Sequence, residues 1–453
     1  MSDVSLFSFF LHRPRSERPY ACVPMGVLYL AAALQAAGYD VDFHDYQVSA
    51  SGNPYTPESV TEFLMRARSD VLGISCMANM LPYLVLGLRR FKREHRDAYV
   101  VLGGAGPSGL GRPILERIPE VDAVVRGEGE EALVQLLAAR AGRFAWDHIQ
   151  GLHWRDRGCV RSNALRARRL DIGSLPWPAY DLLDREHYIG FPVISARGCS
   201  YRCAFCDIAP NAEYRVSMRA IDDVLDEIAM LQARFNATEV TILDDTFSLA
   251  ARRVLSFCAR VRERRMDFTW GCMCRVDGLD DAMIDVMESA GCRRVFFGIE
   301  SGSRRVRRLA GKGLRHGDVE AVIAKTASRF DVAASFILGF PFETLDEFRE
   351  TLWLSIYSSS QGAHPQMSVL SPLPQATLTR SSRYRMAFSR ELISGIAYAR
   401  HGERAVDFLE TALSPEVEHL IRGDSELFSA FYHFVDGQVE KKLDLARMYG
   451  VPT

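Results

Sequence analysis

Short runs of consecutive apolar residues alternate with longer amphipathic stretches over the first 145 residues. The apolar runs are rich in Val, Ile and Leu, which is typical of strands that are buried on both faces. The stretches between them are long enough to form helices. The predicted strands are residues 4–10, 41–44, 71–75, 99–102 and 123–125, and the predicted helices are residues 25–37, 57–68, 82–95 and 128–141. This alternation predicts an α/β fold with a Rossmann-like, doubly wound parallel sheet over residues 1–145.

Small residues follow several of these strands. Ser75 ends the third strand, Gly103 and Gly104 follow the fourth, and Gly127 follows the fifth. Parallel strands bring their carboxyl ends to one edge of the sheet, and ligands of open α/β sheets bind along that edge. We therefore expect a cofactor beside these residues.

The pattern changes twice after residue 145. Residues 146–190 contain an irregular basic hairpin and the sequence Pro176-Trp-Pro178, whose two prolines favour the extended path of a linker. Alternation resumes over residues 191–380, with predicted strands at 193–196, 239–243, 268–274, 294–298, 332–338 and 366–370, and with helices between them such as 218–234, 249–264 and 344–358. The final segment, residues 381–453, is aromatic-rich and predicted to be helical.

Composition excludes several classes of protein. The 453 residues carry a net charge of −2, with 48% apolar and 25% charged residues, which is typical of a globular protein and gives no sign of nucleic acid or membrane as a partner. No apolar run approaches the roughly 18 residues of a spanning helix. The first residues lack the pattern of a secretory signal. We expect a cytoplasmic protein of several domains.

Three of the ten cysteines fall within eight residues, as Cys199-x3-Cys203-x2-Cys206, directly after a predicted strand. A [4Fe–4S] cluster is closed by four thiolates, so three cysteines from one loop can hold three irons and leave the fourth open. A structural zinc site, or a cluster completed by a distant cysteine, is the alternative. Zinc sites usually pair two such hooks or add histidines, and the nearest histidine, His187, precedes the strand. The spacing favours an iron–sulfur cluster.

The cysteine loop resembles the signature of the radical S-adenosylmethionine (SAM) superfamily, C-x3-C-x-aromatic-C, with Phe205 at the aromatic position. Two later stretches, Gly298-Ile-Glu-Ser-Gly302 and Ile337-Leu-Gly-Phe-Pro-Phe-Glu343, resemble other motifs of that superfamily. The resemblance implies a partial (β/α)6 barrel over residues 191–380. It also implies that the open iron chelates SAM and that the reduced cluster cleaves it to a 5′-deoxyadenosyl radical.

The resemblance further implies roles for individual residues. Phe205 would border the adenine, Glu300 and Ser301 would contact the ribose, and Arg275 would face the methionine carboxylate. Asp244 and Asp245 are candidates for the amino group. Each has a structural alternative: Glu300 and the two aspartates could cap helices, and Arg275 could belong to an ordinary ion pair.

The first 145 residues resemble the cobalamin-binding module that precedes many radical SAM barrels. The matching pieces are residues 24–34 with Gly38, 70–75, 101–104 and 121–130. The resemblance implies cobalamin contacts from Ser75, Gly103, Gly104, Ser108, Gly127 and Glu128. The motif D-x-H-x-x-G, whose histidine ligates cobalt, is absent, because no glycine follows Asp42-Phe-His44 in the required register. A platform that holds no corrin is therefore the alternative.

Together these features predict a cobalamin-dependent radical SAM enzyme, most consistent with C-methyl transfer to an unactivated carbon of a small molecule, and supplied with electrons by a flavodoxin- or ferredoxin-type donor. One alternative is a radical SAM enzyme without cobalamin, and another is a non-catalytic iron–sulfur sensor or scaffold. The arginine-rich stretches 252–265 and 304–315 are better explained by a solvated helix face and an anion-attracting segment than by RNA binding. The substrate and the oligomeric state stay open.

Overall fold

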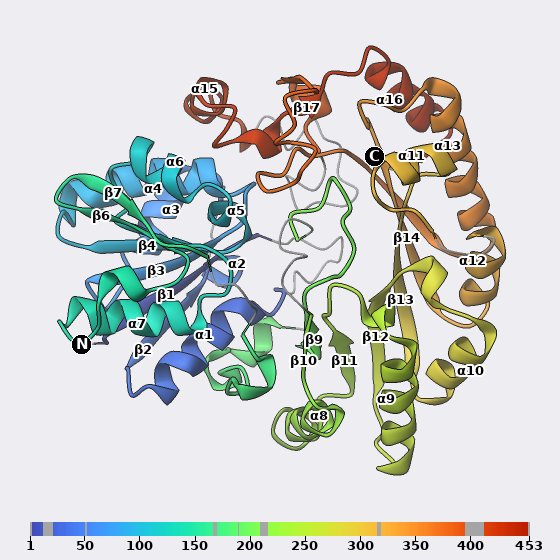
Figure 1. Cartoon of the computed structure of the whole chain (residues 1–453), viewed down its shortest axis with the longest axis horizontal. Helices are drawn as coiled ribbons and strands as arrows, with labels where there is room; N and C mark the ends of the chain where they lie inside the picture. The colour runs from blue at the N-terminus through green and yellow to red at the C-terminus, as the bar shows by residue number, and fades with distance from the viewer. Residues whose placement is uncertain are drawn as a thin grey trace.

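A computed structural model describes residues 2–11, 21–49, 52–165, 170–188, 190–208, 216–314, 319–394 and 412–451. Two α/β domains lie side by side, and the C-terminal segment runs across both of them (Figure 1).

The N-terminal domain is built on a seven-stranded sheet of order β2-β1-β3-β4-β5-β6-β7. Five strands are parallel, as predicted: β1 (Val4–Phe9), β2 (Val41–Asp45), β3 (Val71–Cys76), β4 (Tyr99–Gly103) and β5 (Ala123–Val125). Successive side chains point to opposite faces of a strand, so Leu6 joins the core beneath one face and Phe7 the core beneath the other. The helices therefore cover both faces.

Helices α1 (Met25–Ala36) and α7 (Glu130–Arg140) cover one face of this sheet, and α3 (Pro57–Leu64) and α4 (Leu81–Glu94) cover the other. Thr56 caps α3 by accepting a hydrogen bond from the Ser59 N–H, with Pro57 at the first helical position. The short helices α2 (Tyr46–Ser49), α5 (Ala105–Ser108) and α6 (Gly111–Arg117) follow β2 and β4.

The hairpin predicted within the linker belongs to the N-terminal sheet, which the sequence pattern did not indicate. Strands β6 (Leu152–Asp156) and β7 (Cys159–Ser162) form a hairpin that adds to the N-terminal sheet in antiparallel orientation. Its turn places Arg157 and Gly158 at positive φ, +48° and +83°, as the tightest hairpin turns require. The sheet thus continues past residue 145 to Ser162.

The second domain is a six-stranded, all-parallel sheet of order β15-β14-β13-β12-β11-β8. Its strands are β8 (Phe191–Val193), β11 (Glu239–Ile242), β12 (Thr269–Cys274), β13 (Cys292–Glu300), β14 (Asp331–Leu338) and β15 (His364–Val369). In the part of the chain described here, the edge strands β8 and β15 do not pair with each other, so the barrel is partial, as predicted. The outer helices include α8 (Ile221–Phe235), α9 (Ala251–Glu263), α10 (Asp281–Ser289), α12 (Val319–Ala327) and α13 (Leu345–Ser360).

The described C-terminal region contains the expected helices, α15 (Pro415–Gly423) and α16 (Val439–Met448). It also contains an unexpected two-stranded sheet of β16 (Met386–Ala387) and β17 (His433–Phe434). Val417 and Ile421 of α15 join the core of the N-terminal domain, whereas Leu443 of α16 joins the core of the barrel. The segment therefore ties the two domains together (Figure 1).

Candidate functional site

The cysteine loop leaves the carboxyl end of β8 through the short strand β9 (Ala196–Arg197), which pairs with β10 (Ser217–Met218). Gly198 has a φ of +97°, where a residue without Cβ turns the chain toward Cys199. The Cys206 N–H donates to the Cys203 carbonyl at 3.1 Å, and the Ala204 N–H donates to the Ala310 carbonyl at 2.8 Å. The loop is therefore held against the end of α11 (Arg304–Leu309).

The cysteines fit an iron–sulfur cluster in chemical character. Cys203 is buried, Cys199 and Cys206 are partly buried, and burial raises the pKa of the Cys203 thiol to about 11. A thiolate there requires a nearby cation, which a bound iron provides. No three His, Cys, Asp or Glu side chains within the described ranges converge as ligands of one ion would. A cubane does not require this, because each of its thiolates binds a different iron.

Asp244 and Asp245, which follow β11, hold the segment that leads into the cysteine loop. The Asp244 carboxylate accepts hydrogen bonds from the Ser195 N–H and hydroxyl and from the Ala196 N–H, at 2.7, 2.6 and 2.8 Å. Asp245 accepts from the Gly198 N–H at 2.7 Å. Asp244 is 2% exposed and its carboxylate is occupied by these donors, so the structure gives it a positioning contact in place of the alternative role of helix cap.

Charged side chains gather at the ends of β12 and β13. Arg275 is buried, pairs with Asp277 at 2.9 Å, and stacks over the Tyr201 ring with its Cζ 3.8 Å from the ring centroid. Glu300 has a φ of +68° at an irregularity in the pairing of β13 with β14, and its carboxylate lies 3.0 Å from the Lys312 ammonium. Tyr201 belongs to the cysteine loop, so these charges adjoin it.

The two other predicted SAM residues differ in burial, and Phe205 is only partly buried. Ser301 is fully buried, and its hydroxyl lies 2.9 Å from the Thr351 hydroxyl. Phe205 packs edge-on against Phe340 of the Gly339-Phe-Pro turn, with ring centroids 5.8 Å apart. Two motifs that are separate in the sequence are therefore in contact.

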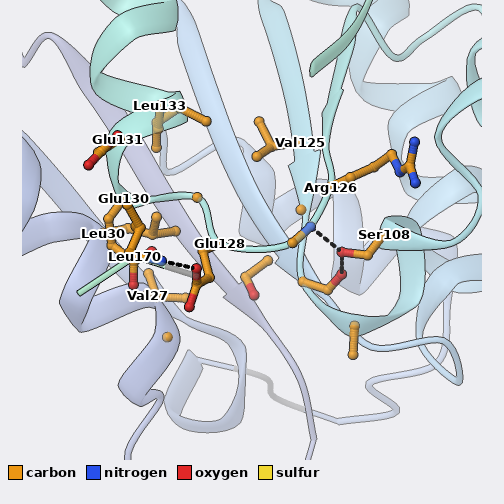
Figure 2. Close-up of a pocket in the computed structure, with 18 of the residues that line it drawn as sticks. Val27, Leu30, Ser108, Val125, Arg126, Glu128, Glu130, Glu131, Leu133 and Leu170 are labelled. Atoms are coloured by element: carbon orange, nitrogen blue, oxygen red, sulfur yellow. Dashed lines mark hydrogen bonds between the residues drawn. The ribbon is translucent and has the colours of Figure 1, made fainter. Parts of the chain in front are cut away.

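All six residues predicted to contact cobalamin line one cavity of about 530 Å³ at the carboxyl edge of the N-terminal sheet. Figure 2 shows Ser108, Val125, Glu128 and Leu133 around it. The Ser108 hydroxyl lies 2.8 Å from the Gly104 carbonyl, and the Gly127 N–H donates to the Ser108 oxygen at 3.3 Å. The loops after β4 and β5 are thereby joined.

Gly104 shows how closely the backbone is packed at this edge of the cavity. Its φ is +89°, and a Cβ there would lie 2.9 Å from the Cys76 carbonyl oxygen and 2.9 Å from the Ser75 hydroxyl. Only a residue without Cβ lets the loop after β4 pack this closely against β3, and this packing shapes the edge at which a corrin would lie. His44 takes no part: it lies on β2, its Nε2 is 2.7 Å from Asp42, and it stacks on Phe7.

Residues of the barrel line the same cavity from the other side, including Arg197, Gly198, Asp207, Asp245 and Gln375. Sequence reasoning identifies only Asp245 among them, and it also misses Lys312 and Tyr201. Tyr201 and Asp207 flank the cysteines and could have been chosen by proximity. Gln375 could not, because its N–H reaches Asp207 at 2.9 Å only through the folded chain.

Family comparisons agree with this two-part site. Residues 15–137 match the model of the B12 binding domain, and residues 193–354 match that of the Radical SAM superfamily. The fold and site thus define an enzyme class that combines a corrin-binding sheet with a SAM-cleaving barrel. The chain thus carries a B12-binding domain followed by a radical SAM domain.

Relatives share most of the chain. An uncharacterized methyltransferase PH0819 from Pyrococcus horikoshii is 29% identical over 338 residues, which are 73% of this chain and 72% of that protein. A cytidylyl-2-hydroxyethylphosphonate methyltransferase from Streptomyces wedmorensis is 24% identical, over 72% of this chain and 71% of its own.

Solved structures show the same fold. The methyltransferase TsrM from Kitasatospora setae, with cobalamin and a [4Fe–4S] cluster bound, has a TM-score of 0.64 at 20% identity and covers 84% of this chain and 74% of its own. The enzyme OxsB, with aqua-cobalamin and SAM bound, has a TM-score of 0.72 at 18% identity over 98% of this chain and 66% of its own. Every helix within the described ranges is too short or too polar to cross a membrane.

Proposed function

We propose that this enzyme transfers a methyl group from SAM, by way of cobalamin, to an unactivated carbon of a small molecule. The observation that carries the proposal is the shared cavity, in which Gly103 and Gly104 of the corrin-type edge face Arg197 and Gly198 of the cysteine loop. When bound, the cluster supplies the electron that cleaves SAM, and the corrin supplies the methyl group. The methyltransferase names of two relatives support this reaction.

The residues of the chain would position these groups. Cys199, Cys203 and Cys206 would hold the cluster, and Glu300, Lys312 and Arg275 would orient the charged groups of SAM. Phe205 and Ser301 would border its adenosine. Ser75, Gly103, Gly104, Ser108, Gly127 and Glu128 would form the floor of the corrin site. Holding reactants in such an arrangement supplies much of the rate of an enzyme.

Anaerobic reconstitution tests the proposal. The wild-type protein, loaded with iron, sulfide and aquacobalamin and given SAM with a low-potential reductant, is expected to form both 5′-deoxyadenosine and S-adenosylhomocysteine. The second product should disappear when cobalamin is omitted. Formation of 5′-deoxyadenosine by a protein that binds no cobalamin would support a corrin-independent enzyme, and formation of neither product would support a sensor or scaffold. A flavodoxin- or ferredoxin-type protein should replace the chemical reductant.

A further inference from the structure

Arg197 reaches from the barrel into the N-terminal domain. Its Nη1 lies 2.6 Å from Glu130 Oε1 and 3.9 Å from Glu128 Oε1, and its Cζ lies 4.6 Å from the centroid of the Tyr29 ring. Tyr29 is on α1, Glu130 begins α7, and Glu128 precedes α7. The Arg197 side chain is only 15% exposed, so the guanidinium is held by the other domain in a largely dry environment.

The other end of Arg197 is fixed to the cysteine loop. Its backbone pairs with Ser217, the next residue is held by Asp245, and Cys199 follows two positions later. Such short connections leave little freedom between the guanidinium and the first cysteine. A shift of Arg197 would therefore move Cys199.

Glu130 carries a second, independent sign of a ligand. It is 4% exposed and lines the cavity, where Figure 2 shows it close to Glu128 and Leu30. Its Oε1 receives Arg197, but its Oε2 is buried and has no hydrogen-bond partner among the described residues. Because a buried carboxylate oxygen without a donor is costly, this atom indicates a donor supplied by the occupant of the cavity.

We propose that the Glu130–Arg197 pair couples the corrin site to the cysteine loop. Glu130 Oε2 accepts an N–H from the primary amides on the periphery of the corrin, and Arg197 balances the Glu130 charge while it holds Cys199 in position. The inference rests on the proposed function, because it assigns the cavity to a corrin. Coupling between binding sites is reciprocal, so the cluster also strengthens corrin binding.

The test measures the dissociation constant of aquacobalamin by its visible absorption, with and without a reconstituted cluster and SAM. We expect the wild-type protein to bind roughly tenfold tighter when the cluster site is filled, a typical size for coupling between two sites. Arg197→Gln should abolish this difference, and Glu130→Gln should weaken aquacobalamin binding in both states. Arg197→Lys keeps the charge but not the planar group over Tyr29, and should keep part of the coupling.

Arg234→Gln is the matched control, because it removes an exposed ion pair with Asp181 in the barrel half of the molecule; its coupling should equal that of the wild type. Wild-type coupling retained in both Arg197 variants would overturn the inference, as would a wild-type protein that binds aquacobalamin equally well in both states. If the cluster strengthens aquacobalamin binding but no S-adenosylhomocysteine forms, the proposed methyl transfer would be overturned and the coupling would stand. A wild-type protein that binds no aquacobalamin would overturn both.

Discussion

The carboxyl edges of the two sheets border one cavity, but different kinds of residue cover them. Gly103, Gly104 and Gly127 line the N-terminal edge among aliphatic side chains such as Val125 and Leu133, and Glu130 lies at the same edge. At the barrel edge, beside the cysteine loop but outside the lining of this cavity, lie Arg275, Glu300 and Lys312, all largely buried and two of them paired with each other. The first edge suits a large ligand recognised by shape and by a hydrogen bond to Glu130, and the second suits a small zwitterion recognised by charge. Substitutions at the glycines of the N-terminal edge should therefore act through volume, and substitutions at the barrel edge should act through the charged side chains.

The largest effect is expected at the cysteine loop, on which the chemistry of both edges depends. Cys203→Ala should abolish the cluster and reduce SAM cleavage to background, because two thiolates cannot hold the cube. Iron content and visible absorption after reconstitution check this. Cys159→Ala, which removes an exposed cysteine from β7, should leave both unchanged. Full activity and brown colour in Cys203→Ala would refute the ligand assignment.

At the N-terminal edge, Gly104→Val should weaken aquacobalamin binding by about tenfold to a hundredfold, because the new side chain would collide with β3 and displace the loop that lines the cavity, and such overpacking costs about 1–3 kcal/mol. The iron content should stay at the wild-type level. Gly142→Val is the matched control: Gly142 also has positive φ, +71°, but a Cβ there would meet no described atom within 4 Å. Equal losses of aquacobalamin binding in the two variants would mean that backbone strain, and not the collision with β3, is responsible.

At the barrel edge, Gly298→Ala should weaken SAM binding roughly tenfold, a loss expected when a buried charge pair is disturbed. The new Cβ would lie 2.5 Å from Glu300 Oε1 and 2.9 Å from Lys312 Nζ, so it would displace the pair. Equilibrium dialysis with labelled SAM measures the change, and aquacobalamin binding should not respond. Gly313→Ala, which adds a methyl group to open space beside Lys312, serves as the control.

The smallest expected effect is on the pH dependence of the free energy of unfolding, through the charge of His153 near the N-terminal edge. Burial, together with Arg126 and Arg112, lowers the pKa of His153 to about 4, and Arg126 lines the cavity. An unfolded histidine titrates near 6.5. Between these values the unfolded chain binds a proton that the folded chain does not, so the free energy of unfolding should fall as pH decreases from about 6.5 to about 4.

His153→Gln should flatten this dependence by about 1–2 kcal/mol over that pH window. Urea unfolding at several pH values measures it. His364→Gln, at an exposed position on β15, is the control and should keep the wild-type slope. An unchanged slope in His153→Gln would show that other groups cause the pH dependence.

Local patterns predict most of the fold. The strands of both sheets lie within a few residues of their predicted positions, since runs of Val, Ile and Leu between helical stretches depend on nearby sequence. The β6–β7 hairpin is predicted only as an irregular hairpin of the linker; its place in the N-terminal sheet is not predicted, because it depends on the pairing of Trp154 with Ala123. The pairing of β16 with β17 joins segments almost fifty residues apart, which periodicity does not report.

The residues of the site fall into the same two groups, those that local sequence identifies and those that only the folded structure identifies. The cysteines and the glycine turns carry their chemistry in short motifs, so residue type and spacing are enough to select them. Folding alone brings three other residues to the site: Arg197, Lys312 and Gln375. The partner of Arg197, Glu130, lies in the other domain, and Gln375 contacts Asp207 at the wall of the cavity. No local pattern distinguishes these three from ordinary surface residues.

The central claim is that one chain holds both the cluster and cobalamin. Metal analysis of the reconstituted wild-type protein, together with an assay of SAM cleavage, tests this claim most directly. We predict about four irons, as one [4Fe–4S] cluster requires, one cobalt per chain, and release of 5′-deoxyadenosine when reductant and SAM are added. Zinc in place of iron, or cleavage of SAM by a protein that never retains cobalt, would contradict the account.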